Sequence, residues 1–233
     1  LQVPDRDNPD QLEDMVLQPK MFEIFKEYLG WNRIMDLKSV GEFNRACQNN
    51  QAFNLIKIAE ALHEKKVASV ADMIQARPTV KVVMISGPSS SGKTTFSKRL
   101  SIQLMVSGLK PKTISLDNYF VDREHTPRDE NGDWDFEALH ALDLPFFNQQ
   151  LSQLMNGEEI ALPSYSFEDG KRHFKGEKLR LEEDTILIME GIHALNPELI
   201  QSIPQDAIFK IYVSALTTIS IDEHNWIPTA DTR

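Results

Sequence analysis

The chain has 233 residues, of which 41% are hydrophobic and 26% are charged, so it has enough apolar side chains for one α/β domain and a smaller segment. The formal net charge of −10 argues against a nucleic-acid partner, because binding phosphate backbones requires a concentrated basic face. The single cysteine, Cys47, excludes an intramolecular disulfide and a cysteine-based zinc site.

No apolar stretch reaches the roughly 18 residues that a membrane-spanning helix needs. The first residues, LQVPDRDNPDQLED, are acidic and polar, unlike a signal peptide. We therefore expect a cytoplasmic protein without a membrane partner. The missing initiator methionine indicates a piece cut from a longer chain.

The first part of the chain is predicted to be helical. Apolar residues recur at three- and four-residue spacings over residues 10–29, and Gly30 then offers a stop signal. Two further helices are expected over residues 39–48 and 52–76. Pro78 ends the last of them, because the residue before a proline disfavours helical backbone angles. We therefore predict a helical segment over residues 1–78 and a second domain over 79–233.

The second domain is predicted to alternate strands and helices. Strands rich in Val and Ile are expected over residues 80–86, 112–116, 184–190 and 207–213, and helices over 93–107 and 142–155. This alternation predicts an α/β fold with a parallel sheet and helices on both faces. Between residues 159 and 181, the dipeptide Asp169-Gly170 predicts a β-hairpin that projects from the end of the sheet.

A phosphate-binding loop (P-loop) follows the first expected strand. Residues 87–94, GPSSSGKT, match G-x-x-x-x-G-K-[ST] between a strand and a helix. Glycines let the backbone N–H groups approach phosphate, and the helix N-terminus favours the anion. The pattern predicts that a nucleoside triphosphate is bound by Gly87, Ser89, Ser90, Ser91, Gly92, Lys93, Thr94 and Thr95.

Two features of the sequence limit the class of protein to which this loop belongs. Such loops occur in regulatory GTPases, remodelling ATPases and small-molecule kinases, and the absence of an N-K-x-D motif disfavours the first class. Lys93 supplies a cation for the β- and γ-phosphates, and the Thr94 hydroxyl is placed for Mg²⁺. Glu190 closes the strand over 184–190, where we expect it on the Mg²⁺ side of the site. The alternative is a strand-end charge that faces solvent.

Asp117, in SLDNYF, follows the strand expected over 112–116. Ligands of open parallel sheets bind at the carboxyl ends of the strands, so Asp117 should face the same crevice as Lys93. There it can accept a proton from an attacking hydroxyl and help to hold Mg²⁺. The alternative is that Asp117 caps the next helix.

The motifs GPSSSGKTT, SLDNYF, DWDFEALHALD, PSYSF and IMEGIHAL, in this order, resemble uridine kinases of the phosphoribulokinase/uridine kinase group. The resemblance covers about residues 80–233. It implies transfer of the ATP γ-phosphate to the 5′-hydroxyl of uridine or cytidine, a step of pyrimidine salvage that gives UMP or CMP.

The resemblance also implies roles for single residues. Asp117 matches the catalytic base, and Thr94, Asp117 and Glu190 match residues around Mg²⁺. Asp135 matches the acid that holds the ribose hydroxyls, and Tyr165 matches an aromatic residue near the base. The alternative role for Tyr165 is hairpin core.

Two departures from the pattern qualify this resemblance. Family members that recognise pyrimidine bases carry a histidine five positions after the residue matched by Tyr165, where this chain has Gly170. Arg172 and His173 lie nearby as candidate substrate residues, with exposed hairpin positions as the alternative. The family also continues past a motif like Asp231-Thr232-Arg233 into an arginine-rich lid, so we expect this chain to bind ATP and turn over slowly.

Three readings of the whole chain therefore stay open. The first is an ATP- and Mg²⁺-dependent nucleoside kinase, the second a related kinase that phosphorylates another alcohol, and the third a nucleotide-binding module without turnover. Residues 1–78 resemble the segment before the kinase in longer bacterial uridine kinase-like proteins. Packing and homo-oligomerisation are the roles left open for this segment.

Overall fold

The computed structural model describes residues 8, 10–12, 19–200, 203–215, 217, 219–222 and 224–227. The chain divides into two compact units, a helical unit of Leu1–Leu62 with Thr217–Thr232 and a sheet unit of His63–Leu216 with Arg233. The functional boundary expected at residue 78 stays a prediction. Among the described residues, no helix has the length and apolar character needed to cross a membrane.

The first helix ends later than its sequence predicts. α1 spans Pro19–Met35 and runs through Gly30, and the described residues 10–12 are not helical. A single helical glycine costs only about 1 kcal/mol, so it does not end a helix by itself. The end is set at Asp36, whose φ is 52°, and the Leu37 N–H donates to the Asn32 carbonyl at 2.9 Å. Residues 13–18 of the expected helix, and the motif at 231–233, lie outside the described residues.

The other long helices agree with the expected spans to within two residues. Their bounds are α2 Val40–Gln48, α3 Ala52–Gln75, α4 Lys93–Val106 and α5 Leu144–Met155. Short 3₁₀ helices lie at Leu116–Tyr119 (η1), Arg123–His125 (η2), Leu139–Ala141 (η3) and Gln205–Ala207 (η4).

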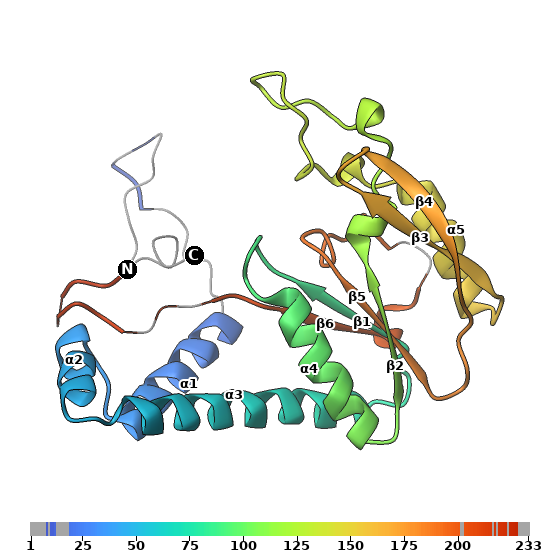
Figure 1. Ribbon diagram of the computed structural model, residues 1–233. Helices are drawn as coiled ribbons and strands as arrows, with labels where there is room; N and C mark the ends of the chain where they lie inside the picture. Colours follow the sequence, from blue (N-terminus) through green and yellow to red (C-terminus); the bar gives the residue numbers. More distant parts are fainter. Residues whose placement is uncertain are drawn as a thin grey trace. The chain divides into compact units, whose positions relative to one another are not determined.

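A parallel four-stranded sheet organises the sheet unit (Figure 1). Its strands are β1 Val82–Ser86, β2 Lys110–Ser115, β5 Thr185–Glu190 and β6 Ile208–Tyr212, in the order β2-β5-β1-β6. The predicted α/β fold is confirmed. Because all four strands run in the same direction, their carboxyl ends meet at one edge. There Glu190 pairs with Ile85 on one side and with Ser115 on the other.

The sheet is buried on both faces, and alternate residues of each strand serve different cores. Val82 and Met84 of β1 join the core formed with α5, and Val83 and Ile85 join the core formed with α3 and α4. This alternation follows from the two-residue period of a strand. Near-continuous apolar strands are therefore required, as VVMI and TILIM provide.

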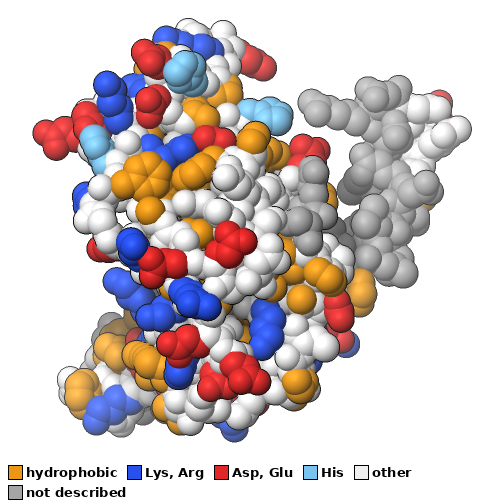
Figure 2. All heavy atoms as spheres, turned by 90° about the vertical axis from the view of Figure 1, so that its right-hand side faces the viewer, with side chains coloured by type: hydrophobic (Ala, Val, Ile, Leu, Met, Phe, Trp, Pro, Cys, Tyr) orange, Lys and Arg blue, Asp and Glu red, His pale blue; other side chains and the backbone are white. Residues whose placement is uncertain are grey.

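The predicted hairpin consists of β3 Ile160–Ser166 and β4 Lys171–Leu179, paired antiparallel with Tyr165 opposite Arg172. Its turn places Gly170 at a φ of 70°, in the left-handed region that glycine adopts without strain. Figure 2 shows the side of the sheet unit that carries the hairpin, where basic and acidic side chains are interspersed. This face therefore has no single-signed surface of the kind that binds nucleic-acid backbone.

Gly30→Ala is expected to stabilise the protein. Gly30 lies in α1 with ordinary helical angles, and a Cβ there would meet nothing within 4 Å. Alanine should raise the free energy of unfolding by about 0.5–1 kcal/mol, because it restricts the backbone of the unfolded chain and causes no strain in the helix. Thermal unfolding of the two proteins measures the change.

Gly157→Ala is the matched control. A Cβ at Gly157 also has open space, but its φ is 75°, so alanine should lower the melting temperature. If both substitutions shifted the melting temperature in the same direction, the backbone angle φ would not be the cause of the difference in stability.

Candidate active site

The loop between β1 and α4 has the backbone of an anion cradle. Ser90 and Gly92 adopt positive φ values of 59° and 89°, which turns successive peptide groups of the loop. Gly87 fixes the start of the loop, because a Cβ there would lie 2.1 Å from the Val213 carbonyl oxygen and 2.7 Å from the Ser91 hydroxyl. No larger residue fits at Gly87 without moving the loop away from the chain after β6.

The N-terminus of α4 is open for a ligand. Gly92 is the N-cap residue and provides no side-chain cap, so the first N–H groups of the helix lack the usual side-chain acceptor. The Ser91 hydroxyl is buried and has no hydrogen-bond partner among the described residues. A phosphate would satisfy such donors, since helix N-termini favour anions.

Lys93, Thr94 and Glu190 meet beside this loop. The Lys93 ammonium donates to the Pro88 carbonyl at 2.9 Å, so it lies over the loop itself. The Thr94 hydroxyl donates to Oε1 of Glu190 at 3.1 Å. Glu190 is only 8% exposed, which rules out the alternative of a charge facing solvent.

The oxygen atoms at this edge suit Mg²⁺. Thr94, Asp117 and Glu190 offer one hydroxyl and two carboxylates, the hard ligands that this ion prefers. Within the described ranges, no group of three or more His, Cys, Asp or Glu side chains could hold a metal ion alone. The donor set therefore fits an ion held partly by substrate phosphates and water, the usual arrangement for protein-bound Mg²⁺.

Asp117 lies in η1, directly after β2. Partial burial raises the pKa of its carboxyl group, while the positive charges of Lys93 and His193 act in the opposite direction. The N-cap of η1 is Ser115, so Asp117 does not serve as the cap. Its carboxylate thus faces the same charged environment as the loop lysine.

His193 was not singled out from the sequence, although it belongs to the motif IMEGIHAL. Its Nε2 atom is buried without a hydrogen-bond partner in the described part of the chain. An electrostatic contribution from His193 also opposes the rise in the pKa of Asp117 that burial causes, so the two side chains lie in one electrostatic environment. The sequence signal that could have indicated His193 as a site residue is its position three residues after Glu190, past the carboxyl end of β5.

An aromatic cluster lies beyond Asp117. The Phe120 ring packs edge-on against Phe136, Tyr165 and Phe167, with centroids 5.4 to 5.8 Å apart. Tyr165 is 8% exposed and its hydroxyl has no partner among the described residues. The structure therefore places Tyr165 in the hairpin core and also leaves a buried polar atom at its tip.

Asp135 precedes Phe136 of this cluster. Its Oδ1 atom accepts the backbone N–H groups of Glu137 at 2.9 Å and Ala138 at 3.1 Å. The carboxylate thus stabilises the turn that Asp135 begins. The second oxygen, Oδ2, has no hydrogen-bond partner in the described ranges.

Arg172 holds the hairpin in place. Its guanidinium donates to Asp143 at 3.0 Å and to the Phe120 carbonyl at 2.9 Å, and it lies over the Phe146 ring. With a third bond to the Tyr119 carbonyl at 3.3 Å, these contacts use three of its five donors, and its Nε atom is buried without a partner among the described residues. A contact between Arg172 and a substrate stays a prediction.

His173 lies on the other side of β4 from Arg172. Its Nε2 is 2.7 Å from the Asp169 carboxylate, and the side chain is 46% exposed. The structure brings together Lys93, Thr94, Glu190 and Asp117, whereas His173 pairs locally at the hairpin tip.

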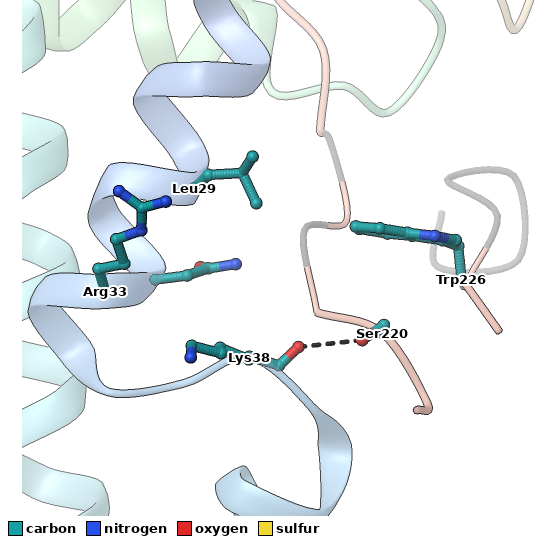
Figure 3. Close-up of a pocket in the computed structure, with 6 residues that line it drawn as sticks. Leu29, Arg33, Lys38, Ser220 and Trp226 are labelled. Carbon is teal, nitrogen blue, oxygen red and sulfur yellow. Dashed lines mark hydrogen bonds between the residues drawn. The ribbon is translucent and has the colours of Figure 1, made fainter. Parts of the chain in front are cut away.

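A separate cavity of about 280 Å³ lies within the helical unit. It is lined by Leu29, Asn32, Arg33, Lys38, Ser220 and Trp226. Figure 3 shows Leu29 pointing toward Trp226, while the Lys38 amino group points away and its carbonyl accepts the Ser220 hydroxyl at 3.1 Å. None of the candidate site residues lines this cavity.

The family model "Phosphoribulokinase / Uridine kinase family" matches residues 82–224, from β1 to beyond β6. The chain belongs to this family. Its P-loop, Glu190 and the hairpin are therefore parts of a P-loop kinase fold.

Curated relatives are uridine kinases. That of Schizosaccharomyces pombe is 34% identical over 135 residues, 56% of this chain and 28% of the relative. That of Lactobacillus helveticus is 30% identical over 132 residues, 57% of this chain and 60% of the relative. The chain thus spans less than two thirds of these relatives.

A solved structure described as a possible uridine kinase from Bacillus stearothermophilus has the same fold. It superposes with a TM-score of 0.53 at 24% identity and covers 64% of this chain and 79% of that chain.

Gly87→Ala is expected to disrupt the loop. The added Cβ would meet a backbone carbonyl, which cannot swing aside as the end of a side chain can. We expect a loss of about 1–3 kcal/mol of stability and weaker ATP binding, since overpacking typically costs this much. Thermal unfolding and calorimetric titration with ATP measure both effects.

Gly41→Ala is the control, because its Cβ would meet only the Ser39 hydroxyl at 3.8 Å. Unchanged ATP affinity in Gly87→Ala would contradict the packing argument.

Proposed function

We propose that this chain catalyses ATP- and Mg²⁺-dependent phosphoryl transfer to the 5′-hydroxyl of a nucleoside, uridine or cytidine, giving UMP or CMP. The observation that carries the proposal is the meeting of the P-loop, the buried Glu190 and Asp117 at the carboxyl ends of adjacent parallel strands. Membership of the family and the names of its relatives support the kinase reaction and this acceptor class.

In this proposal the donor half of the site consists of the loop and its neighbours. The loop N–H groups and Lys93 bind the β- and γ-phosphates, with the Lys93 ammonium moving from the Pro88 carbonyl to phosphate oxygen. Thr94 and Glu190, with Asp117, would hold Mg²⁺, which when bound neutralises charge on the phosphates. Phosphoryl transfer requires chiefly such positioning and neutralisation.

Asp117 is the proposed general base. Its carboxylate accepts the proton of the acceptor hydroxyl as the oxygen forms a bond to the γ-phosphorus. The bond from that phosphorus to the bridging oxygen breaks, and ADP leaves. A carboxyl group whose pKa is raised by partial burial is a better proton acceptor than one in water.

The acceptor half is assigned to Asp135 and the hairpin. The free Oδ2 of Asp135 can accept from a ribose hydroxyl while Oδ1 stays in its turn. Tyr165 is proposed to lie near the base, with its buried hydroxyl as a polar contact. Arg172 and His173 complete the proposed substrate side, Arg172 by holding the hairpin against the loop after η1.

Asp117→Asn should abolish most turnover and leave ATP affinity within a few-fold of the wild-type value. A general base contributes about 10²–10⁴ in rate and acts only in the transition state. ADP release is measured with uridine, cytidine, purine nucleosides and non-nucleoside alcohols as acceptors. Calorimetry measures the affinity for ATP.

The acceptor panel decides among the three readings. Stimulation by uridine or cytidine supports the proposal, stimulation only by another alcohol supports a related kinase, and no stimulation supports a nucleotide-binding module. If ATP affinity collapsed together with turnover in Asp117→Asn, Asp117 would be structural.

Lys93→Ala should weaken ATP binding by roughly tenfold or more, because a charge-assisted hydrogen bond to phosphate is lost. Lys98→Ala is the matched control, since Lys98 is an exposed lysine of the same helix. If the two variants bound ATP with equal affinity, the triphosphate would not bind at this loop.

A further inference from the structure

The side chain of Arg123 lies directly against the hairpin glycine. A Cβ built on Gly170 would lie 2.7 Å from the Cβ of Arg123, 2.8 Å from its Nε and 3.0 Å from its Cζ. The arginine therefore occupies the space that any side chain at position 170 would need. Arg123 belongs to η2, six residues after Asp117.

Two hydrogen bonds fix Arg123 at this place. Its backbone N–H donates to the Gly170 carbonyl at 2.8 Å, and its Nη2 donates to the Phe167 carbonyl. The remaining guanidinium N–H groups have no hydrogen-bond partner in the part of the chain that the structure describes. The first bond fixes the backbone of Arg123, and the second orients its guanidinium, which keeps unused donors.

Two aromatic residues, Tyr165 and Phe167, lie close to Arg123. Phe167 packs on Tyr165 with ring centroids 5.1 Å apart, and it is 54% exposed. Arg123 and Tyr165 also interact electrostatically, and burial leaves the Tyr165 hydroxyl without a partner among the described residues. Aromatic surface beside hydrogen-bond donors is suited to a flat polar ring.

This surface is joined directly to the proposed base. The Tyr165 N–H donates to the side-chain oxygen of Asn118 at 3.2 Å, and Asn118 follows Asp117. Phe120 of the same segment packs on both Tyr165 and Phe167. The hairpin therefore packs on the segment that carries Asp117. In the proposed function, one acceptor molecule has its ring at the hairpin tip and its hydroxyl at Asp117.

We propose that Arg123 is the specificity-determining residue of the acceptor site and donates to the oxygen at position 4 of a pyrimidine ring. The inference rests on the proposed function and names its preferred substrate. The O2 carbonyl is common to uracil and cytosine, so only a contact at position 4 distinguishes the two rings. A guanidinium has five donors and no acceptor, so at that position it pairs with O4 of uracil and leaves the N4 amino group of cytosine unpaired. Uridine is therefore the preferred acceptor.

The test compares Arg123→Met with wild type in ADP release at saturating ATP and varied uridine or cytidine. Wild type should favour uridine by about tenfold or more in kcat/KM, the scale of one charged hydrogen bond. Arg123→Met should lose this preference through a higher KM for uridine, with kcat and the cytidine KM within a few-fold. Arg123→Lys should keep part of the preference, because it keeps a donor.

Two further variants separate recognition from packing. Gly170→Ala pushes the arginine away without removing it, so it should also reduce the uridine preference. Arg180→Met is the control, because Arg180 is exposed and follows the other end of β4, and its nucleoside preference should equal that of wild type. Thermal unfolding of each variant reports its folding.

Three outcomes overturn the assignment. The first is an equal kcat/KM of wild type for uridine and cytidine. The second is an equal loss of kcat/KM for both nucleosides in Arg123→Met. The third is an unchanged uridine preference in folded Arg123→Met. If wild type phosphorylates no nucleoside, the proposed function fails, and calorimetric titration with uridine and cytidine then decides the role of Arg123. A uridine preference in binding that Arg123→Met removes supports it, and its absence overturns it.

Discussion

The close contact between Gly87 and the Val213 carbonyl is the constraint on which the candidate site depends. The Val213 N–H donates to the Ser86 carbonyl at 2.7 Å and holds the chain after β6 against the start of the phosphate loop, where only a glycine fits at position 87. With one end fixed, the loop delivers Lys93 and Thr94 to the sheet edge where Glu190 ends β5. The parallel register of three strands then determines which side chains share that edge.

The elements that position this edge could be predicted from the sequence, because they depend on local patterns. Apolar runs gave β1 and β5, and the loop motif required a helix after Gly92. The end of α1 could not be predicted in this way. Gly30 is a weak local signal, and the actual end depends on a hydrogen bond from Leu37 and on the burial of its side chain.

The acceptor side was less predictable, because its contacts join residues far apart in the chain. The sequence leaves Arg172 open as a substrate residue or an exposed hairpin residue, whereas in the structure it bonds to Asp143 and to the Phe120 carbonyl. His193 lies inside a recognised motif, but the burial of its Nε2 atom and its electrostatic effect on Asp117 appear only in the folded structure. Such roles follow from the packing of loops, which no periodicity of one segment encodes.

The contact between Lys93 and the Pro88 carbonyl has a consequence for how ligands are selected. The loop carries an internal acceptor for its own cation, so an incoming anion must compete with a peptide oxygen already 2.9 Å away. A weak or singly charged anion gains little from this exchange, whereas a triphosphate brings several charged oxygens at once. An anion of high charge therefore offsets the loss of the Lys93–Pro88 bond more easily than one of low charge.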